Sequence, residues 1–80
     1  MNVTAVESSA LAILAYDDAH EILQLEFRSS AIYRYFGVPV QVYEALLGAP
    51  SKGRYFNQAI RGNFPFSRAL DTRAGLQGED

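Results

Sequence analysis

The feature that most constrains this chain is the alternation of apolar and polar side chains from Leu23 to Arg28, within a strand predicted over residues 21–28. The apolar positions are Leu23, Leu25 and Phe27, and the polar positions are Gln24, Glu26 and Arg28. Because successive side chains of a β-strand point to opposite faces, this period of two predicts a strand with one face covered and the other open to water. The rest of the chain must therefore supply a layer that covers the apolar face.

Two neighbouring segments extend this strand into a sheet. Residues 8–16 alternate weakly, and their alanines would also suit a helix. One side of this segment would carry Leu11, Ile13 and Ala15, and the other would carry Ala12, Leu14 and Tyr16. A strand is favoured because residues 17–20 are typical of a tight turn into the next strand. Residues 31–36 form a third predicted strand, so the three together predict an antiparallel meander.

The next segment, residues 40–47, is expected to be helical. Gly37 ends the third strand, and Pro39 suits the start of a helix, where a missing backbone N–H is tolerated. Gly48 and Pro50 end this helix. Its inward face is expected to consist of Val42, Tyr43, Leu46 and Leu47.

A second helix is expected over residues 52–61. The hydroxyl of Ser51 can accept a hydrogen bond from a backbone N–H group of the first turn, which is typical of an N-cap. At about 100° per residue, Tyr55, Phe56, Ala59 and Ile60 fall on the inward side, and Arg54, Gln58 and Arg61 fall on the outer side. The predicted fold class is therefore α+β, a three-stranded antiparallel meander with two helices packed on one face. Residues 64–66 are expected to close an edge.

Length and composition allow a single core. A chain of 80 residues with 49% hydrophobic residues and no cysteine must be held by packing alone. We expect one domain over residues 1–67 and a flexible, polar C-terminal tail over residues 68–80. The apolar run at residues 10–15 is shorter than the roughly 20 residues that cross a bilayer, and no positive cluster opens the chain. A cytoplasmic location is expected.

The charged residues are distributed unevenly. A net charge of -2 argues against a strongly basic nucleic-acid-binding protein. Up to residue 27, every charged side chain is acidic: Glu7, Asp17, Asp18, Glu21 and Glu26. From residue 28 to residue 68, only Glu44 is acidic, and the basic side chains are Arg28, Arg34, Lys52, Arg54, Arg61 and Arg68. This asymmetry predicts a basic face on a protein of acidic total charge.

The start of the second predicted helix is the strongest candidate for a binding site. Lys52 and Arg54 lie in its first turn, where the helix dipole disfavours each exposed cation by about 0.3 to 1 kcal/mol. A bound phosphate would offset this penalty, since free N–H groups, the Ser51 hydroxyl and both cations could converge on it. Arg61 could hold a neighbouring phosphate. The alternative is that both cations simply extend into water.

Tyr33 and Tyr35 share one face of the third predicted strand. If the apolar face of residues 21–28 lies against the helices, cross-strand pairing places both rings on that covered face and Arg34 outside it. We favour this position in the core. The alternative is a platform on which unpaired RNA bases stack.

No set of residues predicts catalysis. His20 adjoins Asp17, Asp18 and Glu21, which suits a solvated turn better than a metal cluster, because no further ligand pair occurs in the chain. No serine, threonine or lysine has an identifiable base partner, and a single histidine is a poor basis for nucleophilic catalysis. We expect no enzymatic activity, no cofactor and no metal.

The order and spacing of several short motifs resemble the KTSC domain. The motifs are Ser8-Ser9, Tyr16, Leu25-x-Phe27, Tyr33-x-Tyr35, Gly37-Val38-Pro39, Tyr43, Ala49, Ser51-Lys52-Gly53, Tyr55-Phe56-Asn57 and Ile60-Arg61. That family is named for the C-terminus of some lysyl-tRNA synthetases and includes free-standing small bacterial proteins. The resemblance covers residues 8–66 and implies a small domain with a central Tyr-x-Tyr and no established activity. The association with a synthetase suggests RNA binding.

Two functions are consistent with these features. The first is phosphate-led binding of RNA, either tRNA or a single strand. Its candidate residues are Tyr33, Arg34, Tyr35, Ser51, Lys52, Arg54, Tyr55 and Arg61. The second is a protein-interaction module that uses the same aromatic and basic surface to hold an acidic or aromatic partner.

Overall fold

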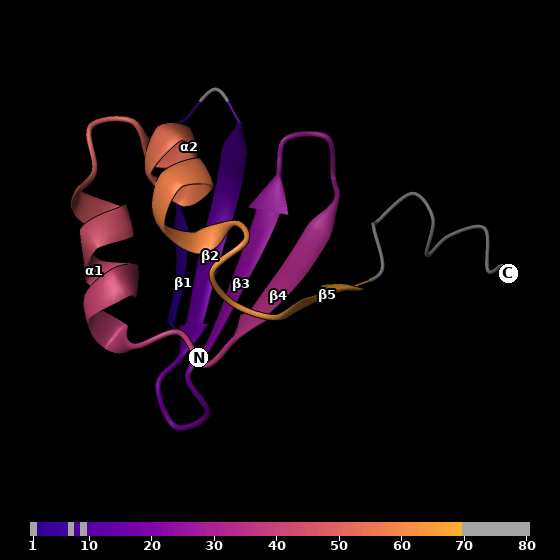
Figure 1. The fold of residues 1–80 in the computed structure, drawn as a ribbon. Helices are drawn as coiled ribbons and strands as arrows, with labels where there is room; N and C mark the ends of the chain where they lie inside the picture. The colour runs from indigo at the N-terminus through magenta and orange to yellow at the C-terminus, as the bar shows by residue number, and fades with distance from the viewer. Residues whose placement is uncertain (1, 7, 9, 70–80) are drawn as a thin grey trace, which may run out of the picture.

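The computed structural model describes residues 2–6, 8 and 10–69. Within them, five strands form one antiparallel sheet in the order β1-β2-β3-β4-β5, and a helical segment between β4 and β5 covers one face of it (Figure 1). The elements are β1 (Asn2–Ala5), β2 (Leu11–Asp17), β3 (Ile22–Phe27), β4 (Ile32–Phe36), α1 (Val40–Gly48), α2 (Lys52–Tyr55), the π-helix η1 (Phe56–Ile60) and β5 (Phe66–Ala69).

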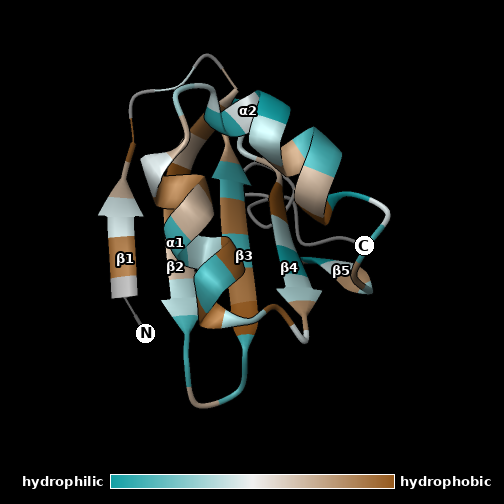
Figure 2. Ribbon diagram, turned by 60° about the vertical axis from the view of Figure 1, so that its left-hand side comes forward, coloured by the Kyte–Doolittle hydropathy of each residue, from teal (hydrophilic) through white to brown (hydrophobic). Residues whose placement is uncertain are grey.

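The fold class is α+β as expected, but the three-stranded meander is wrong. The three expected strands are β2, β3 and β4, and the sheet continues into β1 at one edge and β5 at the other (Figure 2). Asn2 of β1 lies opposite Tyr16 of β2, and Ala69 of β5 lies opposite Ile32 of β4. Both added strands have only 4 residues and little alternation. β1 and β5 satisfy the backbone hydrogen-bonding groups on the edges of β2 and β4. The short sequences of β1 and β5 do not by themselves predict strands.

A β-bulge changes the expected pattern of β2. The pairing register between β2 and β3 shifts between Leu11 and Ile13, so Ala12 is an extra residue on β2. As a result Leu11 and Leu14 are both buried, whereas Ile13 is only half-buried. The expected placement of Leu11 on the same side as Ile13 and Ala15 is therefore wrong, because the extra residue moves every following side chain to the other face.

The core lies between the sheet and the helical segment. Its buried side chains come from β2, β3, β4, the loop between β4 and α1, α1 itself and η1. They are Leu11, Leu14, Tyr16, Leu23, Leu25, Tyr35, Val38, Tyr43, Leu46, Phe56 and Ile60. Burial of this apolar set is the main force that holds the helices on the sheet.

Tyr16 attaches α1 to the sheet in two ways. Its ring stacks on Tyr43 with the ring centroids 4.7 Å apart, and its hydroxyl donates a hydrogen bond to the Val38 carbonyl at 2.6 Å. The inward face expected for α1 is confirmed by the burial of Tyr43 and Leu46. One aromatic pair and one buried polar contact therefore add to the apolar packing that holds α1 over β2.

The second expected helix, over residues 52–61, is divided. Ser51 caps its start as expected, since the Ser51 hydroxyl accepts a hydrogen bond from the backbone N–H of Arg54 at 3.4 Å. The helix then widens from α2 into the π-helix η1, in which the Arg61 N–H donates to the carbonyl of Phe56, five residues earlier, at 2.9 Å. The expected inward face is present, because Phe56 and Ile60 are buried. Short π-helical turns of this kind frequently occur at functional sites.

The last strand crosses the expected end of the domain. β5 continues to Ala69, which lies within the tail expected over residues 68–80. Residues 70–80 lie outside the described part of the chain, so the remainder of that tail stays a prediction. None of the described helices has the length and apolarity needed to cross a membrane.

Candidate functional site

Ser51 and Lys52, at the centre of the expected phosphate site, have partners within the protein. The Ser51 hydroxyl caps α2, and Nζ of Lys52 donates a hydrogen bond to the carbonyl of Ala49 at 3.2 Å. Ala49 is the C-cap of α1, so the ammonium group lies at the negative end of that helix. This contact offsets the unfavourable position of Lys52 in the first turn of α2. Phosphate binding by Ser51 and Lys52 stays a prediction.

Replacing the two cations one at a time should separate their roles. Lys52→Ala should lower the free energy of unfolding by about 0.5 to 1.5 kcal/mol, because the Ala49 carbonyl loses a charged donor. Arg54→Ala should change it by less than about 0.5 kcal/mol, since the exposed guanidinium has no hydrogen-bond or ion-pair partner among the described residues. Urea unfolding followed by circular dichroism measures both values. Equal losses for the two variants would contradict these assignments.

Tyr33 and Tyr35 lie on the covered face of the sheet. In the pairing of β3 with β4, Tyr33 lies opposite Leu25 and Tyr35 lies opposite Leu23. Tyr35 is only 4% exposed, and Tyr33 is half-buried. Burial raises the pKa of the Tyr35 hydroxyl, although the positive charge of Arg61 acts to lower it. The two rings therefore do not form an open stacking platform on a bare sheet.

Arg34 points away from this side of the molecule. It alternates with the two tyrosines along β4, and its Nε donates a hydrogen bond to Oε1 of Gln24, its cross-strand neighbour, at 2.8 Å. The open face of the sheet therefore holds Arg34, and the structure separates it from the other expected site residues.

A pocket lies on the covered face, near the β4 and β5 edge of the sheet. Its cavity measures about 430 Å³, which is within the usual range of small-ligand sites. Five rings line it: Phe27, Tyr33, Tyr35, Phe56 and Phe66. Three polar side chains also line it: Ser29, Asn57 and Arg61. We call this site the aromatic pocket.

The rings of the aromatic pocket contact one another. Phe56 meets Tyr35 edge to face at 5.5 Å and Phe27 at 5.6 Å between ring centroids. Phe66 stacks on Tyr35 at 5.3 Å and is tilted against Tyr33 at 5.7 Å. Phe66 nevertheless remains 56% exposed. An exposed ring beside a pocket offers a flat ligand a stacking surface that requires no opening of the core.

Arg61 supplies the positive charge of the aromatic pocket. It directly follows η1 and is exposed, and its Nη1 donates to Oδ1 of Asn57 at a long 3.5 Å. A guanidinium has five N–H donors, so one long contact leaves most of them available to a ligand. Aromatic walls beside a guanidinium suit a flat ring that carries a negative group.

The structure gathers only part of the site expected from the sequence. Of those residues, Tyr33, Tyr35 and Arg61 line the aromatic pocket. Arg54 and Tyr55 lie on α2 outside the lining of the pocket. The aromatic and polar pocket residues that sequence reasoning missed are Phe27, Ser29, Phe56, Asn57 and Phe66. A usable signal existed for Phe66, because a Phe-Pro-Phe segment is unusual in an otherwise polar C-terminal stretch.

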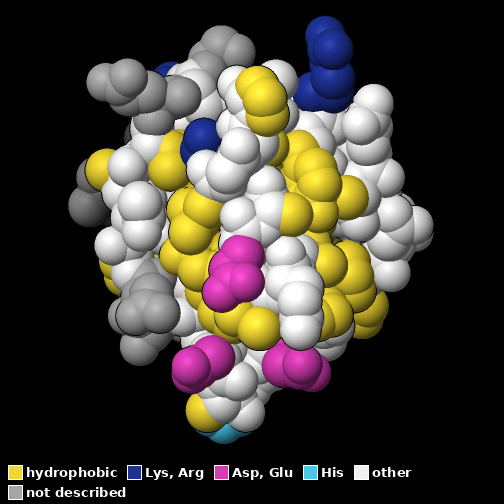
Figure 3. All heavy atoms as spheres, turned by 90° about the vertical axis from the view of Figure 1, so that its left-hand side faces the viewer, with side chains coloured by type: hydrophobic (Ala, Val, Ile, Leu, Met, Phe, Trp, Pro, Cys, Tyr) yellow, Lys and Arg dark blue, Asp and Glu magenta, His cyan; other side chains and the backbone are white. Residues whose placement is uncertain are grey.

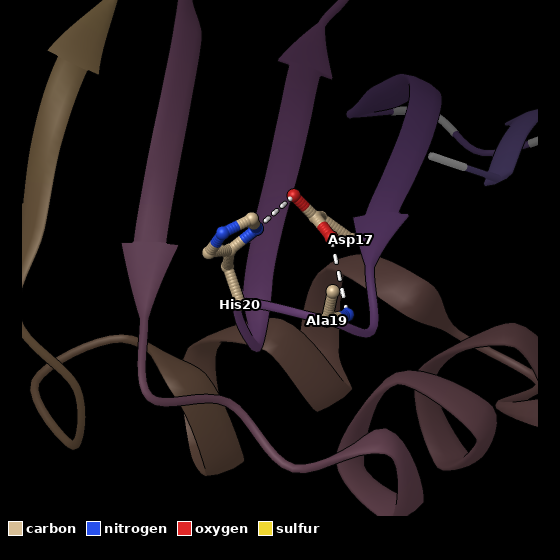
Figure 4. Close-up of polar contacts among 3 residues, drawn as sticks. All are labelled: Asp17, Ala19 and His20. Atoms are coloured by element: carbon tan, nitrogen blue, oxygen red, sulfur yellow. Dashed lines mark hydrogen bonds and ion pairs between the residues drawn. The ribbon is translucent and has the colours of Figure 1, made fainter.

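The acidic turn around His20 forms a local contact and no larger cluster. Nδ1 of His20 lies 2.9 Å from Oδ2 of Asp17, and the Ala19 N–H donates to Oδ1 of Asp17 at 3.1 Å (Figure 4). The hydrogen bond with His20 lowers the pKa of the Asp17 carboxyl. Within residues 2–6, 8 and 10–69, no group of three or more potential metal ligands is assembled.

Comparison with known proteins identifies relatives over most of the chain. A family model described as the KTSC domain matches residues 7–64. An uncharacterized protein of Stutzerimonas stutzeri is 49% identical over 61 residues, which is 76% of this chain and 86% of that protein. A lysine–tRNA ligase of Nostoc punctiforme is 42% identical over 62 residues, which is 78% of this chain but only 11% of the ligase.

The fold also has a solved counterpart. A crystal structure of a KTSC domain protein from Yersinia pestis matches with a TM-score of 0.83 and 32% sequence identity. The match covers 86% of this chain and 97% of that chain.

Proposed function

This chain belongs to the KTSC domain family, and we propose that it is a small non-catalytic module that binds single-stranded RNA. The observation that carries this proposal is the aromatic pocket with Arg61 at its lining. An unpaired base would stack against the exposed ring of Phe66, and Arg61 and Arg54 would hold neighbouring phosphates. The phosphate contacts are therefore proposed along the α2–η1 segment, because Ser51 and Lys52 already have partners inside the protein.

The relatives support the same ligand class. Proteins named lysine–tRNA ligase contain a segment similar to this chain, and that segment is a small part of their length. An RNA partner for the segment agrees with that name. The proposed location is the cytoplasm of a bacterium, in keeping with the sources of the relatives.

Binding of a labelled single-stranded RNA oligonucleotide tests the proposal. If Arg54 and Arg61 neutralise about two phosphates, affinity should fall about sevenfold when salt rises from about 50 to about 200 mM, given the slope for single strands. An abasic oligonucleotide of equal charge should bind about tenfold more weakly, because it lacks the base that stacks. Fluorescence anisotropy measures both quantities.

Three results would contradict the proposal. They are the absence of binding at about 50 mM salt, equal binding of the abasic strand, and tighter binding of a fully paired duplex whose bases cannot enter the pocket. A protein partner that competes for Phe66 and Arg61 would then become the better explanation of this surface.

A further inference from the structure

The opposite edge of the sheet carries a second concave surface with the reverse chemistry. A cavity of about 450 Å³ lies between β1 and α1. Tyr16, Tyr43, Val40 and Leu47 give it an apolar lining, and Asp18 and Glu44 add negative charge. We call this site the acidic groove. Figure 3 shows the corresponding side of the molecule, where acidic side chains border an apolar surface and the Lys and Arg side chains lie away from them.

No described cation of the protein neutralises the carboxylates of the acidic groove. Neither Asp18 nor Glu44 forms an ion pair with a described residue, and none of the described Lys or Arg side chains lines the groove. Burial raises the pKa of Tyr16, and the negative charges of Glu21, Asp18 and Asp17 raise it further. Tyr16 is also a lining residue of the groove.

Apolar side chains and backbone groups are exposed at the same edge of the sheet. Val40 is 38% exposed in the groove, and Val3 is 66% exposed on the open face, because it lies opposite Ala15. β1 is an edge strand, which pairs with β2 on one side and with no other described strand on its other side. A strand edge of this kind accepts an extended chain through backbone hydrogen bonds.

We propose that the acidic groove binds an extended segment of a partner protein in which apolar residues alternate with Lys or Arg. The segment lies beside β1, its apolar side chains contact Val3 on the open face of the sheet, and its cations face Asp18 and Glu44 in the groove. This proposal concerns a different surface from the aromatic pocket and does not depend on RNA binding.

Charge distinguishes this occupant from the others. RNA and anionic membranes are repelled by the carboxylates of the groove. A symmetric dimer through this surface would place the acidic groove of one copy against the acidic groove of the other, which is unfavourable. A cationic, partly apolar segment satisfies both the charge and the exposed apolar side chains.

The test uses the complete chain and two synthetic peptides, one of alternating valine and lysine and one of alternating valine and glutamate. In ¹⁵N NMR titrations, the lysine peptide should shift the amide signals of Val3, Thr4, Val40 and Glu44. The glutamate peptide should bind at least about tenfold more weakly. Glu44→Lys should weaken binding of the lysine peptide about fivefold. Glu26→Lys is the matched control, because Glu26 alternates with the buried Leu25 on β3 and lies away from the groove.

The outcomes separate cleanly. Loss of affinity in Glu44→Lys with little change in Glu26→Lys supports the proposal. Equal losses of peptide affinity in the two variants would mean that net charge alone attracts the peptide. Shifts of amide signals confined to Phe66 and Arg61 would place the peptide in the aromatic pocket. Either result overturns the proposal. Analytical ultracentrifugation tests for self-association. If the chain self-associates and Glu44→Lys abolishes it, the occupant of the groove is a second copy of the chain, and the proposed partner segment is wrong. Because Glu44 is exposed on α1, its substitution should not unfold the protein.

Discussion

Tyr16→Phe should lower the free energy of unfolding by about 1 to 3 kcal/mol. The substitution keeps the ring that stacks on Tyr43, but it removes the hydroxyl that donates to the Val38 carbonyl at 2.6 Å. Tyr16 is 1% exposed and Val38 is fully buried, so water cannot readily replace the lost donor. The expected cost is therefore that of a buried carbonyl left without a partner. Urea unfolding at neutral pH measures it.

The same variant should also change the response to alkaline pH. Burial and three nearby carboxylates raise the pKa of Tyr16 above its ordinary value of 10.0, so the fold favours the neutral hydroxyl. This stabilisation is fully present below pH 10, and it is lost as pH rises through the pKa that Tyr16 has in the folded protein. Tyr16→Phe should therefore lose less stability above pH 10 than the parent protein. Because burial also raises the pKa of Tyr35, both proteins should still lose some stability above pH 10.

Tyr43→Phe is the control for this experiment. It retains the stacked ring pair, and the Tyr43 hydroxyl makes no hydrogen bond to another described residue, so neutral-pH stability should change by less than about 0.5 kcal/mol. Equal destabilisation by Tyr16→Phe and Tyr43→Phe would show that the Val38 contact contributes nothing specific.

The parts of the fold that were predictable from the sequence depend on neighbouring residues. The period of two in residues 21–28 identified β3, and pairing with β4 then assigned Tyr33 and Tyr35 to the covered face. Likewise, Ser51 as an N-cap follows from local hydrogen-bonding chemistry. These features need no knowledge of where distant segments lie.

The features that were not predictable depend on contacts between distant segments. β1 and β5 form because the edges of β2 and β4 need backbone partners, and the bulge at Ala12 exists only relative to β3. The aromatic pocket depends on the same kind of contact, since Phe66 reaches Tyr35 only after β5 has paired with β4. The expected phosphate site considered α2 alone and missed that the end of α1 supplies the partner of Lys52.

The two edges of the sheet thus differ in chemistry. The aromatic pocket lies toward β4 and β5 with Arg61, and the acidic groove lies beside β1 with Asp18 and Glu44. This separation agrees with the uneven distribution of charged residues along a chain of net charge -2. It also allows an RNA strand and a cationic protein segment to bind the same small domain without competing for one site.

Phe66→Ala should weaken binding of single-stranded RNA by about 1 to 3 kcal/mol, the usual loss when one base–aromatic stack is removed. The fold should survive, because 56% of the side chain is already exposed. Phe66→Tyr should retain affinity within about twofold, since it keeps an aromatic face for the base. Fluorescence anisotropy with one RNA oligonucleotide compares the variants.

Val3→Ala is the matched control for Phe66→Ala, because Val3 is an exposed apolar residue at the other edge of the sheet, 66% exposed. Its removal should leave RNA affinity unchanged. If both alanine variants weaken binding, the effect comes from general loss of apolar surface or of stability, and the base does not stack in the aromatic pocket. If Phe66→Ala alone weakens binding and the abasic strand is insensitive to it, the ring contacts the base itself, because only a ligand with a base loses that contact.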